Sequence, residues 1–553
     1  MTTPTKQGIV PWPTADALRF RDAGYWEDRP LFSYVQAAAV RNPHAIALVD
    51  GGVRLSYDEV MSRVDGAALR LLDTGFRHDD RVLVQLPNTW QFVVITLACL
   101  RIGVIPVMAL PAHRAHELEY LAELSESVAI IVPDEHREFD HQQLGEAIAA
   151  RVDSVEHVIV LGSQVNPGNL SLNALVEPAD DHVGARERLD SLAPTGDDVA
   201  VFLLSGGTTG LPKLIPRTHN DYAYNIRQTS LVCELDTKTV YLAALPASHN
   251  FPLACPGFLG ALFAGGRVVM ALSPEPVRIF ELMRSEGVTI TAVVPAVAQR
   301  WIDFQERSAE PPPPSLEVLQ VGGSRLADEL AVEVRPVLGA TLQQVFGMAE
   351  GLINMTRLHD DDAIIVSTQG APVSEADEIK IVDGDGGELP LGATGVLLTR
   401  GPYTPRGYFR APEHNARSFT PDGWYISGDI VEAREDGNLV VRGRDKDMIN
   451  RGGEKVSGEE VENFVYHFHQ VAIAAAVAMP DATLGERVCV FVELKPGGAL
   501  ELEQVRDRMN KAGVAAYKLP ERLVVVDRIP LTKIGKIDKK QLREDIAGVI
   551  GDA

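Results

Sequence analysis

The sequence predicts an α/β protein, with helix-covered parallel sheets in a large N-terminal domain and a smaller unit at the C-terminus. Three observations indicate this fold class. Apolar strand-like runs alternate with amphipathic helical segments through the first 440 residues. A glycine-rich loop directly follows one of the strand-like runs. The charge balance changes near residue 445, where a second unit is expected to begin.

The expected strands are short apolar runs, as in buried parallel sheets, and the helices between them have apolar residues at helical spacing. Strands are expected at 128–132, 157–161, 199–203, 239–245, 268–272, 288–294 and 316–321, and helices at 256–264 and 277–285. The proline run 311–314 is expected to be a rigid loop. In such folds ligands bind at the carboxyl ends of strands. The glycine-rich loop lies at such an end.

Length and charge predict two domains, 1–444 and 445–553. A chain of 553 residues is too long for one hydrophobic core. The net charge is −24, but from Met448 onward 15 Lys and Arg stand against 16 Asp and Glu, so nearly all the acidity precedes that point. The polar, turn-rich segment 442–447 marks the boundary. The overall acidity argues against nucleic-acid binding.

Targeting and redox features are few. The longest apolar segment, 92–100, is too short to span a membrane. The N-terminal residues 1–7 lack the apolar core of a signal peptide, so we expect a cytoplasmic location. The four cysteines are widely spaced and suggest neither a zinc site nor a disulfide framework.

The glycine-rich loop carries the groups needed to hold a triphosphate. Glycines let the backbone approach an anion, hydroxyls and N–H groups donate to phosphate oxygens, and a lysine adds positive charge. A flexible surface turn is the alternative. Because Pro212 precedes the lysine and no Gly-Lys-Ser/Thr opens a helix, this is not an ordinary P-loop. The candidate residues are Ser205, Gly206, Gly207, Thr208, Thr209, Gly210 and Lys213.

This loop resembles the phosphate loop of the adenylate-forming superfamily, which contains acyl-CoA synthetases, luciferases and peptide-synthetase adenylation domains. The family's other motifs follow in order over nearly the whole chain, six in register. They are Gly322-Gly323-Ser324, the run from Gln343 to Glu350, Tyr425-Ile426-Ser427-Gly428-Asp429, Arg444, and the run from Pro530 to Lys536. The resemblance implies the adenylate-forming fold, with a small mobile C-terminal α+β domain.

The resemblance also implies the roles of these residues. Adenine and substrate are contacted by Gly322, Gly323, Ser324, Gln344, Val345, Phe346 and Gly347. Glu350 is the expected Mg²⁺ ligand, because a hard cation takes oxygen ligands from one carboxylate and the ATP phosphates. Asp429 and Arg444 contact the ribose. Lys446 falls at the hinge between the domains.

Lys536 is the implied adenylation lysine. A carboxylate attacks the α-phosphorus of ATP in line while pyrophosphate leaves, so catalysis consists mainly of positioning and charge neutralisation. By resemblance, the small domain then rotates, withdraws Lys536 and forms a tunnel for a thiol with residues 451–455. Lys455 would then lie near the adenylate phosphate.

The segment from Pro246 to Gly257 indicates the acid. It resembles the free-standing aryl-acid adenylating enzymes of siderophore pathways, nearest to the salicyl-AMP ligases of mycobactin-type assembly. The Asn250 amide can hydrogen-bond a carboxylate and an ortho-hydroxyl, and Phe251 offers an aromatic face. His249 resembles the residue that changes rotamer between the half-reactions. A structural loop histidine is the alternative.

Two residues favour one acid over another. In this group the enzymes for 2,3-dihydroxybenzoate have serine and valine where Cys255 and Ile353 stand here. A thiol forms weaker hydrogen bonds than a hydroxyl does, and isoleucine is larger than valine. We therefore expect salicylate first and 2,3-dihydroxybenzoate second, with discrimination of about one to two orders of magnitude.

The expected acceptor is the phosphopantetheine thiol of an aryl carrier domain of a nonribosomal peptide synthetase. Because the chain holds no carrier domain after Lys536, the carrier is expected in trans. A basic patch with Lys539 and Lys540 would meet an acidic carrier, or is simply a solvated helix. Two alternatives stay open: an aryl-CoA ligase that uses free coenzyme A, and a catalytically silent nucleotide-binding protein of this fold.

Overall fold

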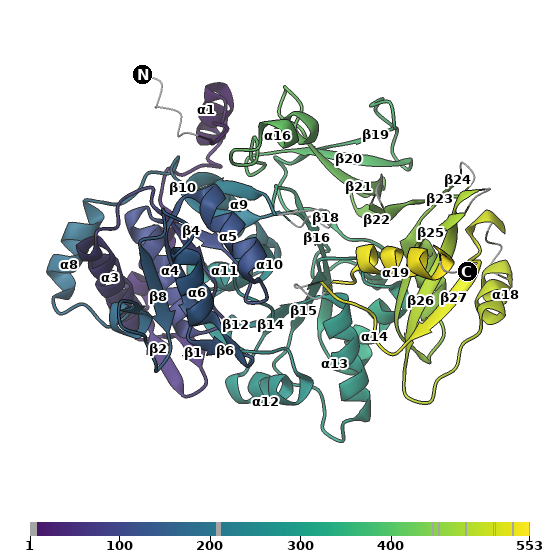
Figure 1. The fold of residues 1–553 in the computed structure, drawn as a ribbon, viewed down its shortest axis with the longest axis horizontal. Helices are drawn as coiled ribbons and strands as arrows, with labels where there is room; N and C mark the ends of the chain where they lie inside the picture. The colour runs from purple at the N-terminus through teal and green to yellow at the C-terminus, as the bar shows by residue number, and fades with distance from the viewer. Residues whose placement is uncertain are drawn as a thin grey trace.

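The computed structural model describes residues 8–205, 212–444, 447–451, 454–481, 484–511, 514, 516–532 and 536–551. Within these ranges the elements form a large body and a smaller C-terminal one, which lies at one end of the long axis (Figure 1). Two helix-covered sheets and one antiparallel sheet make up the large body.

The first sheet has the strand order β18-β17-β16-β15-β14-β12-β13-β1-β2. Strands β1, β13, β12, β14, β15 and β16 run parallel, while β2, β17 and β18 join antiparallel at the edges. The strands are β1 Ile46–Asp50, β2 Val53–Ser56, β12 Val240–Ala243, β13 Arg267–Met270, β14 Ile290–Val293, β15 Val318–Gly322, β16 Thr341–Gly347, β17 Ile353–Met355 and β18 Ala371–Pro372.

The second sheet has the order β11-β10-β4-β3-β5-β8-β9 and is parallel except for β11. Its strands are β3 Arg81–Val84, β4 Ile105–Met108, β5 Ser127–Pro133, β8 His157–Leu161, β9 Leu170–Ser171, β10 Val199–Leu204 and β11 Leu214–Thr218. These strands are almost wholly buried, as expected for apolar runs covered on both faces. A short hairpin, β6 Glu135–His136 and β7 Phe139–Asp140, lies beside it.

The third sheet corrects the expectation that parallel pairing extends to residue 440. Its order is β19-β20-β21-β22 and every pairing is antiparallel. The strands are β19 Glu378–Val382, β20 Thr394–Arg400, β21 Tyr425–Ala433 and β22 Leu439–Arg444. The short connection 434–438, with Gly437 at positive φ, leaves no room for a crossover helix between β21 and β22.

The C-terminal body is an α+β unit. Its sheet has the order β24-β23-β26-β25, with β27 parallel to β26. The strands are β23 Ile449–Arg451, β24 Glu454–Val456, β25 Val471–Asp481, β26 Gly485–Leu494 and β27 Arg522–Val526. The helices are α17 Gly458–Tyr466, α18 Leu502–Lys511 and α19 Lys539–Gly551, with a 3₁₀ turn at Ala516–Lys518.

Most helices of the large body cover the first two sheets, whereas α16 packs against β21 of the third (Figure 1). The helices of this body are α1 Thr14–Asp22, α2 Leu31–Arg41, α3 Tyr57–Thr74, α4 Trp90–Ile102, α5 Ala115–Ser125, α6 His141–Ala149, α7 Leu172–Leu175, α8 His182–Asp190, α9 His219–Val232, α10 Asn250–Ala254, α11 Gly257–Ala264, α12 Pro276–Glu286, α13 Pro295–Arg307, α14 Asp328–Leu338, α15 Asp362–Ser367 and α16 Pro412–Ser418.

The apolar segment 92–100 lies in α4, where every one of its side chains is buried in the core. In the part of the chain that the structure describes, no helix has the length and apolar character needed to cross a bilayer.

Candidate functional site

A small cavity opens where parallel strands of the first sheet end. Leu245 follows β12, Val294 follows β14 and Gly323 follows β15, so three carboxyl ends of strands meet there. Its free volume is about 10 Å³, roughly the room for one water. The lining residues are Leu245, Pro246, His249, Phe251, Val294, Gly323 and Lys536.

Lys536 enters this cavity from the C-terminal body. Its N–H donates to Thr532 Oγ1 at 3.1 Å, and its carbonyl accepts from the Thr532 N–H at 2.6 Å, so two hydrogen bonds close the turn that carries it. A Cβ on Gly323, which has φ +86°, would lie 3.1 Å from Lys536 Cε. Glycine at this position therefore leaves room for the lysine side chain.

His249 is the N-cap of α10, and its Nδ1 accepts a hydrogen bond from the Phe251 N–H at 3.3 Å. Burial and, to a smaller extent, the nearby Lys536 charge lower the pKa of His249 to about 4. The ring is neutral at pH 7. Because Nδ1 is an acceptor, the proton of the neutral ring is on Nε2.

Glycines form one wall beside α10. A Cβ on Gly322 would lie 3.0 Å from the Phe251 ring and 2.8 Å from the Val345 carbonyl oxygen. A Cβ on Gly347 would lie 3.2 Å from Ile353 Cγ1. These contacts are too close for a side chain, so glycine at the two positions lets the Phe251 ring and Ile353 pack directly against the backbone.

The predicted acid-binding residues come together on α10 and β17. Asn250 Oδ1 accepts from the Tyr222 hydroxyl at 2.8 Å, and Asn250 Nδ2 lies 3.4 Å from Cys255 Sγ. Burial raises the pKa of the Cys255 thiol to about 12, so it stays protonated. Ile353 is buried, and its N–H donates to the Tyr403 hydroxyl at 3.2 Å.

A fully buried ion pair supports this wall. Arg217 Nε donates to Asp221 Oδ1 at 2.6 Å, and both side chains are 0% exposed. The same guanidinium donates to the carbonyl oxygens of Ala349 and Tyr403, at 3.0 and 3.2 Å. Burial raises the pKa of Asp221, and the guanidinium opposes that shift. The pair therefore ties α9 to the segments on both sides of β17.

The base of the glycine-rich loop is a closed hairpin between β10 and β11. The Ser205 N–H donates to the Lys213 carbonyl, and the Lys213 N–H donates to Ser205 Oγ, both at 2.9 Å. The loop residues Gly206, Gly207, Thr208, Thr209 and Gly210 lie outside the described residues. The ends that the structure describes hold the loop at the carboxyl end of β10.

Glu350 is buried near the loop. The Tyr408 hydroxyl donates to Glu350 Oε1 at 2.9 Å, and Lys213 Nζ lies 5.6 Å from the centre of the Tyr408 ring. Tyr408 therefore links the lysine of the glycine-rich loop to the carboxylate. A buried carboxylate beside a phosphate-binding loop fits the oxygen-ligand chemistry of Mg²⁺.

The predicted ribose residues lie at paired positions on two neighbouring strands of the third sheet. Asp429 on β21 is buried and pairs in register with Arg444 on β22, whose side chain is not among those described. Lys446 lies outside the described residues, and Lys455 is placed on β24 without a described side chain.

The remaining predicted residues surround the ends of β15 and β16. Ser324 is exposed directly after β15, and Val345 and Phe346 lie on β16. The Gln344 side chain donates to the carbonyl oxygens of Ile365 and Val366, its backbone N–H donates to Thr356 Oγ1, and its carbonyl accepts from the Thr356 N–H.

Among the described side chains, two contacts between a basic and an acidic group join the bodies around this site. His467 Nε2 lies 2.7 Å from Glu329 Oε1 on α14, and Lys495 Nζ lies 3.0 Å from Asp303 Oδ1 on α13. Both pairs are partly exposed, with side-chain exposures between 16% and 35%. We call them the interdomain ion pairs. They hold the C-terminal body in the orientation that brings Lys536 into the cavity.

The two lysines of the basic patch suggested at the C-terminus both have acidic neighbours. Lys539 Nζ pairs with Glu462 Oε1 of α17 at 2.7 Å, and its side chain is 18% exposed. Lys540 is exposed and lies 3.7 Å from Glu544 on its own helix. Lys539 therefore anchors the segment that follows Lys536, because a neighbouring carboxylate compensates its buried charge.

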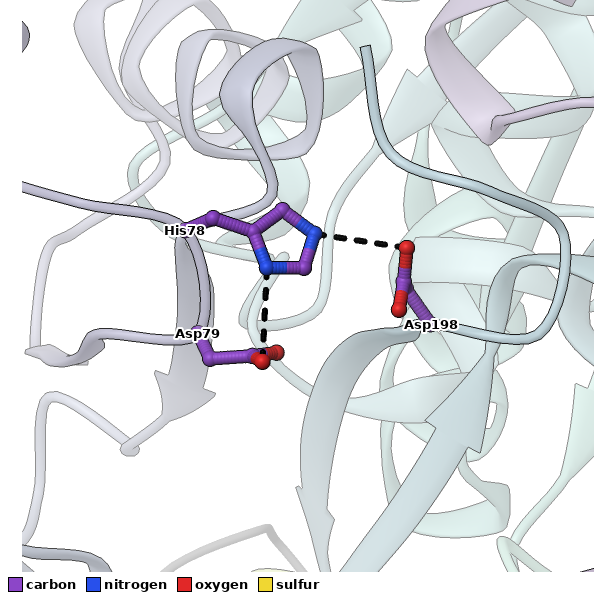
Figure 2. A group of neighbouring side chains, drawn as sticks. All are labelled: His78, Asp79 and Asp198. Atoms are coloured by element: carbon purple, nitrogen blue, oxygen red, sulfur yellow. Dashed lines mark hydrogen bonds and ion pairs between the residues drawn. The ribbon is translucent and has the colours of Figure 1, made fainter. Parts of the chain in front are cut away.

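Figure 2 shows a second group of titratable side chains away from the cavity, in which the His78 imidazole lies between two carboxylates. Nδ1 is 3.3 Å from Asp79 Oδ2, and Nε2 is 3.3 Å from Asp198 Oδ2. Hydrogen bonds to Asp198 and Asp79 raise the pKa of His78 to about 9. The ring is therefore a cation that joins the segments preceding β3 and β10.

The motifs did not identify the residues that hold the site in place. Tyr222, Arg217 and Asp221 were not predicted, and neither was Tyr408. A signal exists for two of them: Thr218 and Asp221 have capping-box spacing at the start of α9, and Arg217 precedes that cap directly. For Tyr222 and Tyr408 the sequence offers no pattern that separates them from core aromatics.

Comparisons with known proteins extend over the whole chain. Residues 35–409 match the AMP-binding enzyme family, and residues 460–536 match the AMP-binding enzyme C-terminal domain. A salicylyl-CoA synthase / salicylate adenylyltransferase from Streptomyces sp is 59% identical, over 98% of each chain. The salicyl-AMP ligase / salicyl-S-ArCP synthetase of Mycobacterium tuberculosis is 45% identical, over 97% of this chain and 94% of that protein. The apo structure of MbtA from Mycobacterium smegmatis has a TM-score of 0.74 and 44% identity, and the match covers 97% and 98% of the two chains.

Proposed function

Because the chain belongs to the AMP-binding enzyme family and its relatives are ligases, we propose that it activates an aryl carboxylic acid with ATP and passes the acyl group to a thiol. One observation carries this proposal. The ammonium side chain of Lys536 reaches from the C-terminal body into a cavity that His249 and Phe251 also line. A mobile cation beside an aromatic wall suits the meeting of an aryl carboxylate with ATP.

We assign the acid as salicylate, with 2,3-dihydroxybenzoate second. Asn250 would bind the ortho-hydroxyl, while Cys255 and Ile353 would close the far end of the pocket. The thiol and the larger aliphatic side chain disfavour a 3-hydroxyl group. The names of the relatives that are 59% and 45% identical refer to salicylate, which supports this choice.

ATP would lie along the ends of β15 and β16. We assign Gly322, Ser324 and residues 344–346 to the adenine, Asp429 and Arg444 to the ribose, and the loop from Ser205 to Lys213 to the phosphates. Glu350 would hold Mg²⁺, which supplies positive charge to the departing phosphates. The Tyr408 hydroxyl holds the carboxylate of Glu350 in place.

In the first half-reaction a carboxylate oxygen attacks the α-phosphorus. A new oxygen–phosphorus bond forms as the bond to the β-phosphate oxygen breaks, and pyrophosphate leaves with that electron pair. Lys536 would bridge the two anions, with Gly323 providing the space. Neutral His249 adds no second positive charge beside the lysine.

In the second half-reaction a thiolate sulfur attacks the acyl carbon, and AMP leaves. We propose that the C-terminal body turns at Lys446 between the two steps, so that Lys455 replaces Lys536 near the phosphate. The relative that is 59% identical is named for a CoA thioester, and the one that is 45% identical for a carrier-bound thioester. This favours free coenzyme A, with an aryl carrier domain of siderophore assembly as the second candidate. Both ATP and coenzyme A are cytoplasmic substrates, and we place the reaction in the cytoplasm.

The test is ATP–pyrophosphate exchange with salicylate, 2,3-dihydroxybenzoate, benzoate and a fatty acid. We expect the highest exchange with salicylate and a loss of about 100-fold in the Lys536→Ala variant, comparable to the loss of one preorganised transition-state donor. Preference for the fatty acid would refute the assignment of Asn250. Thioester formation with coenzyme A and with a phosphopantetheinylated carrier protein then identifies the acceptor.

A further inference from the structure

The side-chain amide of Asn250 is held in one orientation by a tyrosine behind it. Tyr222 lies on α9, fully out of solvent, and its hydroxyl donates to Asn250 Oδ1 at 2.8 Å. The other end of the amide, Nδ2, is directed to Cys255 Sγ at 3.4 Å. Asn250 stands between His249 and Phe251, which both line the cavity.

The hydroxyl of Tyr222 fixes which end of the amide faces it. Burial raises the pKa of Tyr222 well above its ordinary value, so the phenol keeps its proton. A buried phenol proton requires an acceptor, and among the described side chains Asn250 Oδ1 is the one that accepts it. With the amide reversed, the phenol proton would lose this acceptor and a buried hydrogen bond would be unmet.

The Tyr222 ring is itself supported by a buried ion pair. The Arg217 guanidinium lies 4.8 Å from the centre of the Tyr222 ring, and Asp221 fixes that guanidinium in turn. Tyr222 therefore has a supported position from which to orient Asn250. As a result, the Asn250 oxygen is directed to Tyr222, and the amide presents a donor group, of which one N–H is directed to Cys255 and the other would be available to an acid.

The orientation of the Asn250 amide distinguishes aryl acids by their ortho substituent. In a 2-hydroxybenzoate the hydroxyl proton bonds to the acid's own carboxylate, so the hydroxyl oxygen keeps lone pairs that accept an N–H. In a 2-aminobenzoate the nitrogen lone pair is delocalised into the ring, and an N–H points outward. Two N–H groups would then face each other at Asn250.

We propose that Tyr222 is a positioning residue that fixes Asn250 as a hydrogen-bond donor and so selects acids with an ortho oxygen over acids with an ortho amine. This inference rests on the proposed aryl-acid activation and adds the rule by which the pocket selects its substrate. A hydrogen-bonding pocket of this kind rejects the wrong partner because polar groups are left unpaired.

The test compares three acids in the full-length wild-type enzyme and in Tyr222→Phe, with kcat/KM taken from pyrophosphate release. We expect the variant to lose about tenfold for salicylate, which corresponds to one buried hydrogen bond. The 2-aminobenzoate value should stay the same or rise, so the ratio of the two falls. Benzoate has no ortho group and should change little.

A second variant keeps the inference open to refutation if Tyr222→Phe folds poorly. Asn250→Asp replaces the N–H donor with an oxygen at nearly constant shape, and should move the preference toward 2-aminobenzoate. An unchanged ratio of salicylate to 2-aminobenzoate in both variants, or an equal loss for benzoate, would overturn the inference. Failure of the wild-type enzyme to activate any of the three acids would instead overturn the proposed function.

Discussion

The interdomain ion pairs make a quantitative prediction about the two half-reactions. Glu329→Gln and Asp303→Asn keep the shape of each side chain and remove its charge, so His467 and Lys495 lose their partners. Partly exposed ion pairs each contribute about 0.5 to 1 kcal/mol, so the double variant should destabilise this orientation by about 1 to 2 kcal/mol, a roughly 5- to 30-fold change in population.

The expected outcome is selective. In the proposed mechanism the orientation that brings Lys536 into the cavity serves the first half-reaction, so single-turnover formation of aryl-AMP should slow within that range. Thioester formation from preformed aryl-AMP should be unchanged or faster, because the competing orientation is more populated. High salt should reduce the difference between wild type and variant, because it screens exposed charges.

A matched control lies within one sheet of the large body. Arg400 and Glu378 form an ion pair of 2.6 Å between β19 and β20, with side-chain exposures of 25% and 39%. Glu378→Gln removes a comparable charge away from the contact between the bodies, and should not change the rate of either half-reaction. The reasoning is refuted if the double variant slows both half-reactions equally, or if neither rate differs from that of the control.

Three further predictions concern stability and the acid pocket. Because the folded pKa of His78 is raised to about 9, its stabilisation is fully present below about pH 6.5 and is lost as pH rises through 9. His78→Gln should lower the free energy of unfolding by about 1 kcal/mol at pH 7, after screening of a 40% exposed ring, and by little at pH 10; urea titrations at both pH values measure this. Asp221→Asn leaves Arg217 buried without its counter-charge and should cost about 3 to 5 kcal/mol in urea unfolding. Gly347→Ala places a methyl group 3.2 Å from Ile353 Cγ1 and should raise KM for the aryl acid about tenfold, with KM for ATP unchanged.

The parallel part of the fold could be predicted because each buried strand is a short apolar run. The expected strand at 157–161 coincides with β8, and those at 199–203 and 288–294 differ from β10 and β14 by a few residues at most. Short runs of this kind fit strands of a sheet covered on both faces, whereas the longer apolar run 92–100 forms the buried helix α4. The fold class is confirmed by the AMP-binding family match and the match to the MbtA structure.

The third sheet was wrongly predicted as parallel because its strands are half-exposed and their apolar pattern is weaker. In β19 only the last two residues are buried, and β20 mixes buried with partly exposed positions. The turn residues between β21 and β22 indicate the antiparallel pairing that the strand residues alone do not. Pairing direction depends on such connections rather than on the strands themselves.

Residues that contact ligands carry recognisable motifs, whereas the residues that support them do not. Asn250 and Lys536 were predicted, and Thr532, which bonds the lysine turn, lies within the predicted motif from Pro530 to Lys536. Tyr222, which bonds the amide, follows from a tertiary contact. A tyrosine in a helix is usually a core residue, and nothing local shows that its hydroxyl meets an amide on another element. The roles assigned to Asn250, Lys536 and the other site residues remain predictions.

The closed cavity sets an order of events. Because the cavity between His249, Phe251 and Lys536 has room for about one water, the proposed mechanism requires an aryl acid to enter before the C-terminal body brings the lysine in. Under the same proposal the mixed anhydride would be enclosed by these side chains, and bulk water would reach it only when that body moves away. The movement that would admit the thiol would then also expose the intermediate to hydrolysis, so activated acid would be lost chiefly when no thiol is present.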